Sequence, residues 1–247
     1  MGWLSGFFEG VADAVSGFLG GVSSFVESIG LGGVAGILST IASFAIPGLG
    51  LPEILSIISL VAEIVGVLAK ALGLNEKEEK PEKIGFKSEV AELKPENFDN
   101  NMVQYNQYLS KYELTEEQEE RFASLTEEEI NKYKVVGMGI EIEGIKEKLS
   151  ENNSTVTNLT ECIRDLARVD MSSEEILECV QQCTEAGICD LTDITNYLAE
   201  KNTVESAETI GGALTEAIGN LYPELTQNGI AEKIGDMSEM VRKLYKE

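Results

Sequence analysis

The chain has 247 residues, enough for one large domain or two smaller ones, and its 43 acidic and 19 basic side chains give a formal charge of −24. It contains no histidine, which removes the usual general base, the commonest metal ligand and every histidine-activated nucleophile. The negative charge opposes binding to nucleic-acid phosphates, which requires a footprint of lysine and arginine. A hydrophobic content of 43% excludes a wholly disordered acidic chain.

The composition changes sharply about a third of the way along the chain. Residues 1–74 contain five acidic residues and one lysine, whereas the remainder contains 38 acidic and 18 basic residues. Between them lies a charged run that holds a proline, which is typical of a solvated linker. We therefore predict a hydrophobic, glycine-rich membrane or assembly segment over residues 1–74, a charged linker over 75–84 and an acidic all-helical domain over 85–247.

Glycines recur every four residues at the start of the chain, so one face of a helix there carries no bulky side chain. Helix backbones approach closely along such strips, as in helix pairs within lipid. Each glycine costs a solitary helix about 1 kcal/mol relative to alanine, so close packing must offset that cost. Glu9 and Asp13 add an acidic edge that makes this helix amphipathic. The predicted interface with a membrane or with other copies consists of Gly2, Trp3, Gly6, Phe7, Phe8, Gly10, Gly32 and Gly36.

A run of 25 uncharged residues, 28–52, has the length of a membrane span, but prolines and glycines interrupt it. We predict one helix over 31–46 and a second over 53–72, which form an apolar helical hairpin with a turn at Pro47, Gly48, Gly50 and Pro52. Glu53 suits the positive end of the second helix dipole. Glu63 lies inside that helix and would cost about 2.5–3.5 kcal/mol facing lipid. These two carboxylates are the candidate switch for conditional insertion, with Glu63 protonated or facing a lumen.

The acidic part of the chain carries repeated helix signals. Thr115, Thr126 and Ser173 each precede a cluster of acidic residues, which is typical of a capped helix start. The segment Val135–Glu143 fits either a short strand or a helix, and we favour a helix because no second strand is evident to pair with it. The predicted fold class is all-α, with an N-terminal glycine-rich amphipathic helix, an apolar helical hairpin and then an acidic helical bundle.

The cysteines, Cys162, Cys179, Cys183 and Cys189, follow no paired zinc-binding spacing. The first three lie on apolar helical faces, which favours buried free thiols; disulfides and a four-thiolate metal site are the alternatives. Motifs for nucleotide, hydrolase or calcium chemistry are missing from the sequence. Acidic clusters such as Glu116–Glu120 fit a solvated helix face better than a pair of catalytic carboxylates. We therefore predict a protein that is not an enzyme and has no cofactor or metal.

Apolar surface as extensive as that of residues 1–74 needs cover from lipid, from protein partners or from the rest of the chain. We predict a non-enzymatic membrane-interacting protein that inserts or associates through its N-terminal helices. In composition it resembles delivered pore-forming effectors and toxins, or virion proteins ejected into a host envelope. The alternative is a structural helical component of a phage particle or of a contractile injection or secretion machine, with its N-terminal helices buried in a multi-copy assembly. An acidic decoy for a basic protein is a third class, but it leaves residues 1–74 without a role.

The expected partners follow from these functions. They are a lipid bilayer, copies of the chain itself in an oligomer, and a carrier or delivery-machine protein, but not nucleic acid. The first basic residue is Lys70, so the N-terminus lacks the positively charged start of a secretory signal peptide. We expect a location at a membrane after delivery by another route, or within a virion or secretion assembly.

Overall fold

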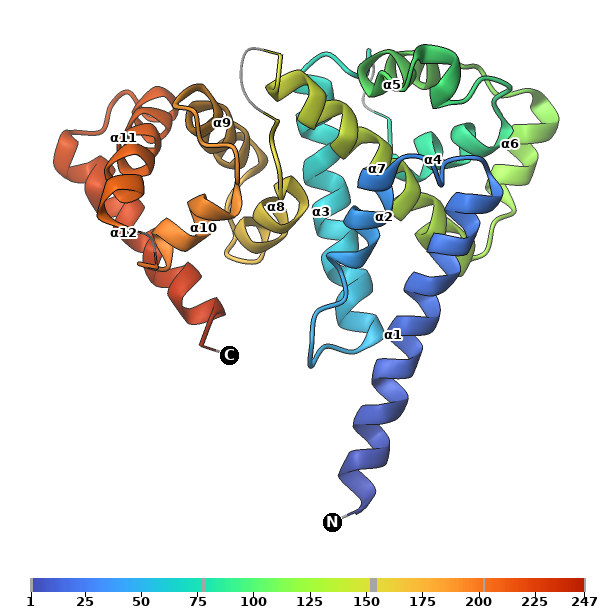
Figure 1. The fold of residues 1–247 in the computed structure, drawn as a ribbon, viewed down its shortest axis with the longest axis horizontal. Helices are drawn as coiled ribbons and strands as arrows, with labels where there is room; N and C mark the ends of the chain where they lie inside the picture. The colour runs from blue at the N-terminus through green and yellow to red at the C-terminus, as the bar shows by residue number, and fades with distance from the viewer. Residues whose placement is uncertain (1, 77–78, 152–154, 202, 247) are drawn as a thin grey trace. The chain divides into compact units, whose positions relative to one another are not determined.

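The computed structural model describes residues 2–76, 79–151, 155–201 and 203–246, without the side chains of 2–12, 204 and 205. This part of the chain is mainly helical. Those residues form twelve α-helices and one 3-10 helix and contain no β-strand (Figure 1). The prediction of an all-α fold is therefore confirmed. The chain divides into two compact units, Met1–Ile145 and Lys146–Glu247.

The first unit runs from the first helix to most of the seventh. Its elements are α1 (Gly2–Ser28), α2 (Ala35–Ala42), α3 (Leu51–Ala71), α4 (Pro81–Val90), the 3-10 helix η1 (Pro95–Phe98), α5 (Met102–Lys111), α6 (Glu116–Ala123) and α7 (Glu127–Leu149). The boundary between the two units falls near the end of α7. The second unit contains α8 (Leu159–Ala167), α9 (Ser173–Glu185), α10 (Thr192–Leu198), α11 (Val204–Leu221) and α12 (Gln227–Leu244).

The three predicted helix starts are found at the predicted positions or one residue away. Thr115 and Thr126 precede α6 and α7, and each hydroxyl accepts a hydrogen bond from the backbone N–H three residues further on, at 3.3 Å. The third start differs by one residue, because Ser172 rather than Ser173 is the N-cap of α9. The Ser172 hydroxyl accepts from the Glu175 N–H at 3.2 Å, and the Glu175 carboxylate accepts from the Ser172 N–H at 2.9 Å. This reciprocal pair satisfies two backbone donors that the helix itself leaves free.

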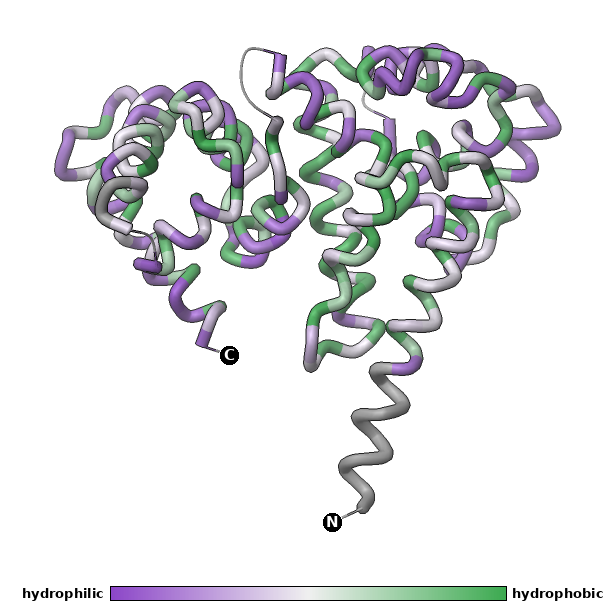
Figure 2. The backbone as a smooth tube through the Cα atoms, viewed as in Figure 1, coloured by the Kyte–Doolittle hydropathy of each residue, from purple (hydrophilic) through white to green (hydrophobic). Residues whose placement is uncertain are grey.

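α7 is the core helix of the first unit. Residues 135–142 are all buried, and because they cover more than two turns, α7 is enclosed on every side there. Val135–Glu143 lies within this helix, so the prediction of a helix for that segment is confirmed. α1 and α3, in contrast, each bury one apolar stripe, and the tube in Figure 2 is strongly hydrophobic along α2 and α3. The stripe of α1 consists of Val15, Leu19, Val22 and Val26.

Glycines allow other helices to approach α7 closely. A Cβ atom on Gly137 would overlap the carbonyl oxygen of Pro81, and Gly85 of α4 faces the same crossing. A Cβ atom on Gly139 would lie 3.0 Å from the side chain of Ile37 in α2, and Gly144 lies against α5 in the same way. The small residues of α7 therefore serve contacts inside the first unit.

The predicted apolar hairpin is shorter than expected. The helix expected over 31–46 is confined to α2, because the chain turns at Gly32 and Gly33 before it and ends the helix ahead of Phe44, whose ring is fully buried. α3 begins at Leu51, two residues earlier than predicted. The expected turn does lie between them, and Gly48 adopts a φ of 84°, which glycine reaches without strain.

The predicted linker over 75–84 does not coincide with the division between the two units. Asn75 and Ile84 are buried, and α4 begins at Pro81 and packs against α7. The charges of this stretch are partly neutralised within the fold, since the carboxylate of Glu79 lies 2.7 Å from the Nζ atom of buried Lys87. Residues 85–145, which we expected in the acidic domain, consequently share one core with the N-terminal helices.

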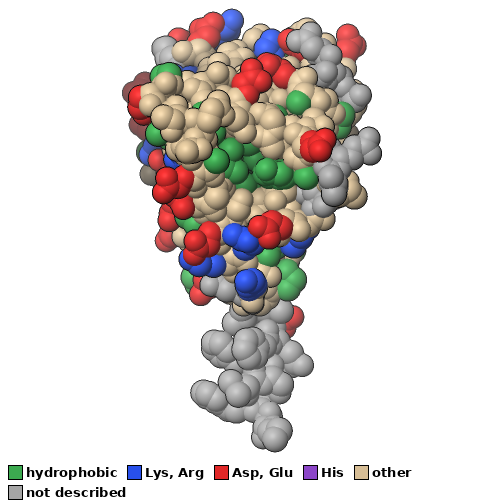
Figure 3. All heavy atoms as spheres, turned by 90° about the vertical axis from the view of Figure 1, so that its left-hand side faces the viewer, with side chains coloured by type: hydrophobic (Ala, Val, Ile, Leu, Met, Phe, Trp, Pro, Cys, Tyr) green, Lys and Arg blue, Asp and Glu red, His purple; other side chains and the backbone are tan. Residues whose placement is uncertain are grey.

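In the second unit, α9 packs against α11, and α10 packs against α8 and α12. The carboxylate of Glu175 joins three elements, because it accepts hydrogen bonds from Tyr222 at 2.9 Å and from Lys233 at 2.7 Å. The buried carboxylate of Asp165 similarly accepts from Tyr245 at 2.8 Å. Figure 3 shows one face of the chain, on which a small hydrophobic patch is exposed and both acidic and basic side chains lie farther out.

The four cysteines are free thiols, of which Cys162, Cys179 and Cys183 are buried and Cys189 is half-buried. Burial raises the pKa of Cys183 to about 12, and it raises the pKa of Cys162 and Cys179 as well. Because the thiolate is the reactive form, we expect a thiol reagent to modify Cys189 at least about a hundredfold faster than the other three in the native protein. Timed labelling followed by peptide mass spectrometry measures this ratio, with Cys189→Ala as the control. Equal labelling of all four thiols would contradict the burial of Cys162, Cys179 and Cys183.

Candidate functional site

Among the residues that the structure describes, α3 is the helix long and apolar enough to cross a membrane by length and composition. A core helix of a soluble protein meets the same criterion, so the surroundings of α3 are informative. In this structure 44% of its most apolar window is buried. More than half of the window is therefore only partly covered by the rest of the unit.

α3 has a buried and an exposed face. The buried face, which is closed off from solvent, carries Ile54, Ile58, Val61, Val65 and Leu68. The exposed face is mostly polar and carries Glu53, Ser56, Leu60, Glu63 and Lys70. Leu60 has 39% of its surface exposed, so it interrupts an otherwise polar stripe. In the folded unit α3 is thus an amphipathic surface helix whose apolar side rests on its neighbours.

The two carboxylates of the candidate switch both lie on this exposed face. Glu53 is in the first turn of α3, where its charge suits the positive end of the helix dipole. Glu63 lines a cleft of about 440 Å³ between α3 and the start of α4, together with Glu79 and Glu82. The structure places neither Glu53 nor Glu63 in the interior.

The glycines and aromatic residues of the predicted interface fall into two groups. The backbone of the first group belongs to α1, but its side chains lie outside the described residues; this group consists of Gly2, Trp3, Gly6, Phe7, Phe8 and Gly10. Gly32 and Gly36 have neighbours within the first unit. A Cβ atom on Gly36 would overlap the carboxylate of Glu143 in α7, and one on Gly32 would lie 3.1 Å from the Cγ atom of Glu27. In this structure both glycines therefore make room for acidic side chains of the same unit.

The residues of the predicted turn lie where α2 connects to α3. Pro47 and Gly48 are exposed, Gly50 is the N-cap of α3, and Pro52 occupies the first turn of α3, where a missing N–H costs nothing. This loop leaves the N-terminal end of α3 at the surface of the first unit.

Buried contacts hold the C-terminal end of α3 in place. Gly73 has a φ of 74°, which ends the helix, and the N–H of Leu74 then donates to the carbonyl of Ala69 at 2.9 Å. Leu74 is buried against α7. Asn75, with 4% of its surface exposed, donates through Nδ2 to the Oε1 atom of Glu141 at 2.6 Å. The segment that follows α3 is therefore anchored in the middle of α7.

Glu141 is the most unusual side chain of this anchor, because none of its surface is exposed. Burial raises its pKa to about 8, against the lowering effect of the Asn75 hydrogen bond and with a further increase from the charges of Glu79 and Glu82. The carboxyl group is consequently protonated in most molecules at neutral pH. Glu141 was not among the predicted site residues, although an acidic residue inside the apolar run that begins at Val135 is a signal for a buried carboxyl group.

Polar atoms near this anchor are incompletely paired. Within the described part of the chain, four buried side-chain oxygens have no hydrogen-bond partner: Asn75 Oδ1, Glu141 Oε2, Asn106 Oδ1 and Tyr105 Oη. The amide nitrogen of Asn106 donates to the carbonyl of Ile140, one residue before Glu141. An unpaired buried polar atom costs about 1–3 kcal/mol. Two of the four belong to the bonded pair Asn75 and Glu141, so this pair calls for a physical explanation.

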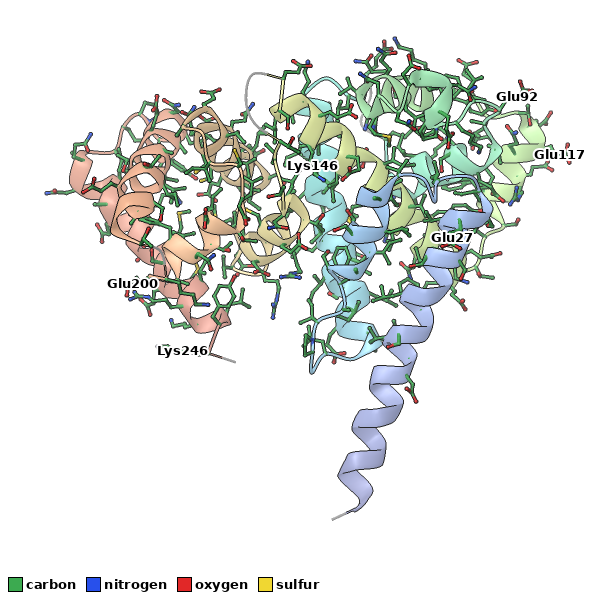
Figure 4. The ribbon with its side chains drawn as sticks, in the orientation of Figure 1. Glu27, Glu92, Glu117, Lys146, Glu200 and Lys246 are labelled. Carbon is green, nitrogen blue, oxygen red and sulfur yellow. The ribbon has the colours of Figure 1, made fainter. Side chains whose placement is uncertain are left out.

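The other charged groups of the first unit offer less for binding or catalysis. A polar cleft of about 530 Å³ is lined by Lys83, Lys87 and Lys111, and each of these lysines is already paired with a glutamate. Glu92 and Glu117 lie at the outer edge of the unit (Figure 4). No group of three or more acidic or cysteine side chains is placed to hold a metal ion among the residues with described positions.

Comparisons with known proteins supply no relative for this chain. No protein-family model matches it, and no curated protein or solved structure is significantly similar to it. Its function must therefore be inferred from α3, from the face that α3 exposes and from the anchor at its end.

Proposed function

We propose that the protein is non-enzymatic, that it interacts with membranes through its N-terminal helices, and that α3 is the segment that enters the bilayer. The observation that supports this proposal is the mismatch between the length of α3 and its cover. A helix of 21 residues is about 31 Å long, which equals the thickness of a bilayer core, yet only 44% of its most apolar window is buried in the first unit.

The proposed transition exchanges one apolar environment for another. In the soluble state the apolar face of α3 rests on α1 and α4, and Lys134 of α7 donates to the hydroxyl of Ser59 at 3.1 Å. In the bilayer, lipid replaces these contacts. The loop that contains Pro47 and Gly48 leaves the N-terminal end of α3 free to move first, because that loop is exposed.

Glu63 sets the form that the inserted state takes. It lies near the middle of α3 and would cost about 2.5–3.5 kcal/mol against lipid. This cost falls when the side chain faces a lumen or another copy of α3. An inserted oligomer is therefore the form that we propose, as in a delivered pore-forming effector or toxin, or in an ejected virion protein.

Exchanging Leu60 for lysine tests whether α3 is the inserting segment. Leu60 has 39% of its surface exposed on α3, and Leu93, between α4 and η1, has 40% exposed, so Leu93→Lys is a matched control with the same change of charge. We expect flotation with phosphatidylcholine vesicles to fall at least about tenfold for Leu60→Lys, because a charge near the middle of the span disfavours insertion. We expect Leu93→Lys to float as the wild type does.

Both substitutions are at exposed positions, so the free energy of unfolding should change by less than about 0.5 kcal/mol in each case. If the wild type binds vesicles and the two variants float equally well, α3 is not the inserting segment. If the wild type ignores vesicles but forms oligomers that Leu60→Lys disrupts, the structural alternative holds, in which protein rather than lipid covers α3 in a phage particle or injection machine.

A further inference from the structure

The hydrogen bond between Asn75 and Glu141 leaves two buried oxygen acceptors without partners when the carboxyl group is ionised. The amide Nδ2 of Asn75 donates to Oε1 of Glu141 at 2.6 Å, and this leaves Oδ1 of Asn75 and Oε2 of Glu141 without partners. Both atoms are acceptors when Glu141 is ionised. A proton on Oε2 of Glu141 turns one of these two buried acceptors into a donor and removes the buried charge.

The Asn75–Glu141 pair connects the segment that follows α3 to α7. Asn75 comes four residues after the end of α3, and Glu141 lies in the enclosed part of α7. Leu74 is buried against Gly144, one turn further along α7. Any movement that lifts the C-terminal end of α3 from α7 must break the Asn75–Glu141 pair and expose Leu74.

We propose that the proton on Glu141 is a latch that holds the C-terminal end of α3 on α7, and that loss of this proton releases that end. The use of the released helix in a bilayer rests on the proposed function, but the latch itself is a property of the first unit.

The surroundings of Glu141 favour the protonated form. The charged groups whose fields reach it are Glu79 and Glu82, which are both acidic. The carboxylate of Glu79 is itself paired with Lys87 at 2.7 Å, and Lys87 also donates to the carbonyl of Leu109 at 3.1 Å. Asn106 of α5, which bonds to the neighbouring carbonyl of Ile140, is uncharged.

Hydrogen exchange in the full-length chain tests the latch. Glu141→Gln keeps an acceptor for Asn75 and supplies a permanent donor, so it should hold the end of α3 closed at every pH. We expect the ratio of opening between wild type and Glu141→Gln, measured at the backbone amides of residues 68–74, to rise about tenfold per pH unit between pH 5.5 and 7.5. The reason is that the carboxyl group has a pKa of about 8 when closed and an ordinary one of 4.5 when open. Taking the ratio removes the pH dependence of intrinsic exchange.

Glu63→Gln is the matched control, because it removes one carboxylate of α3 that is exposed rather than buried. We expect it to follow the wild type. A ratio that stays constant from pH 5.5 to 7.5, or an effect of Glu63→Gln equal to that of Glu141→Gln, would overturn the latch.

Vesicle flotation at pH 7.5 separates the latch from the membrane function. We expect Glu141→Gln to bind phosphatidylcholine vesicles at least about tenfold less than the wild type. If the end of α3 opens with rising pH but no protein floats, the latch stands and the membrane proposal fails. If wild type and Glu141→Gln float equally, the latch fails as the control of insertion while the membrane proposal stands.

Discussion

Gly137→Ala is expected to destabilise the first unit by about 3 kcal/mol or more, although alanine is the better helix former by about 1 kcal/mol. The added Cβ atom would overlap the carbonyl oxygen of Pro81, and it would also approach the backbone nitrogen of Gly85 at 2.8 Å. Both neighbours are backbone atoms of α4, so no side chain can turn away to make room. The two helices must separate, and α4 then loses its contact with the core helix.

Gly20→Ala is the matched control for this substitution. Gly20 lies on the exposed side of α1, and a Cβ atom there would meet nothing within 4 Å. We expect this change to leave the unit as stable or to stabilise it by up to about 1 kcal/mol. Hydrogen exchange of the amides of residues 135–142 reports on the first unit alone. If Gly137→Ala and Gly20→Ala had equal effects, the close crossing of α4 and α7 would be wrong.

Raising the pH from 5 to 8 is expected to lower the free energy of unfolding of the first unit through Glu141 by about 4 kcal/mol. Folding raises the pKa of this carboxyl group from 4.5 to about 8, so the folded state holds one more proton than the unfolded state between these values. The stability is therefore fully present below pH 4.5 and is lost as the pH rises through this range.

Glu141→Gln should remove this part of the pH dependence. The variant should be more stable than the wild type at pH 8 by about 4 kcal/mol and nearly equal to it at pH 5, because glutamine cannot ionise and still bonds to Asn75. The slowest-exchanging amides of α7, corrected for intrinsic rates, give the free energies. A stability difference that does not change with pH would show that Glu141 is ionised in the folded protein.

The helices themselves could be predicted from sequence patterns. Thr115 and Thr126 cap helices where a hydroxyl before acidic residues predicts a cap, and the absence of a pairing partner correctly favoured a helix over Val135–Glu143. Such signals are local, because a cap involves residues three apart. The end of α2 ahead of Phe44 depends instead on which residues the core takes in, and the local pattern does not contain that information.

The division of the chain was harder to predict for a physical reason. Composition separates the apolar segment 1–74 from the acidic remainder, but helices from both parts share one core. α3 packs against α4, and the ring of Phe25 in α1 packs against that of Tyr133 in α7. The charged stretch around Glu79 resembled a solvated linker because its pairing with Lys87 is visible only in the folded chain.

The anchor at the end of α3 was missed because two distant residues make it. Asn75 and Glu141 are 66 positions apart, and nothing in the sequence indicates that the faces of two helices bring them together. Gly36 shows the same limit, since its row of small residues suggested an external interface, whereas the structure places Glu143 against it. Glycine rows predict close packing but do not identify the partner.

Hydrogen exchange with and without phosphatidylcholine vesicles tests most directly whether α3 leaves the first unit for a bilayer. At saturating lipid and pH 7.5, we predict that amides of residues 135–142 in α7 lose protection because the core of the first unit opens when α3 leaves it. Those of Leu51–Ala71 keep their protection, because a helix in lipid retains its backbone hydrogen bonds. Unchanged protection in both helices, in protein that has demonstrably bound the vesicles, would contradict the account.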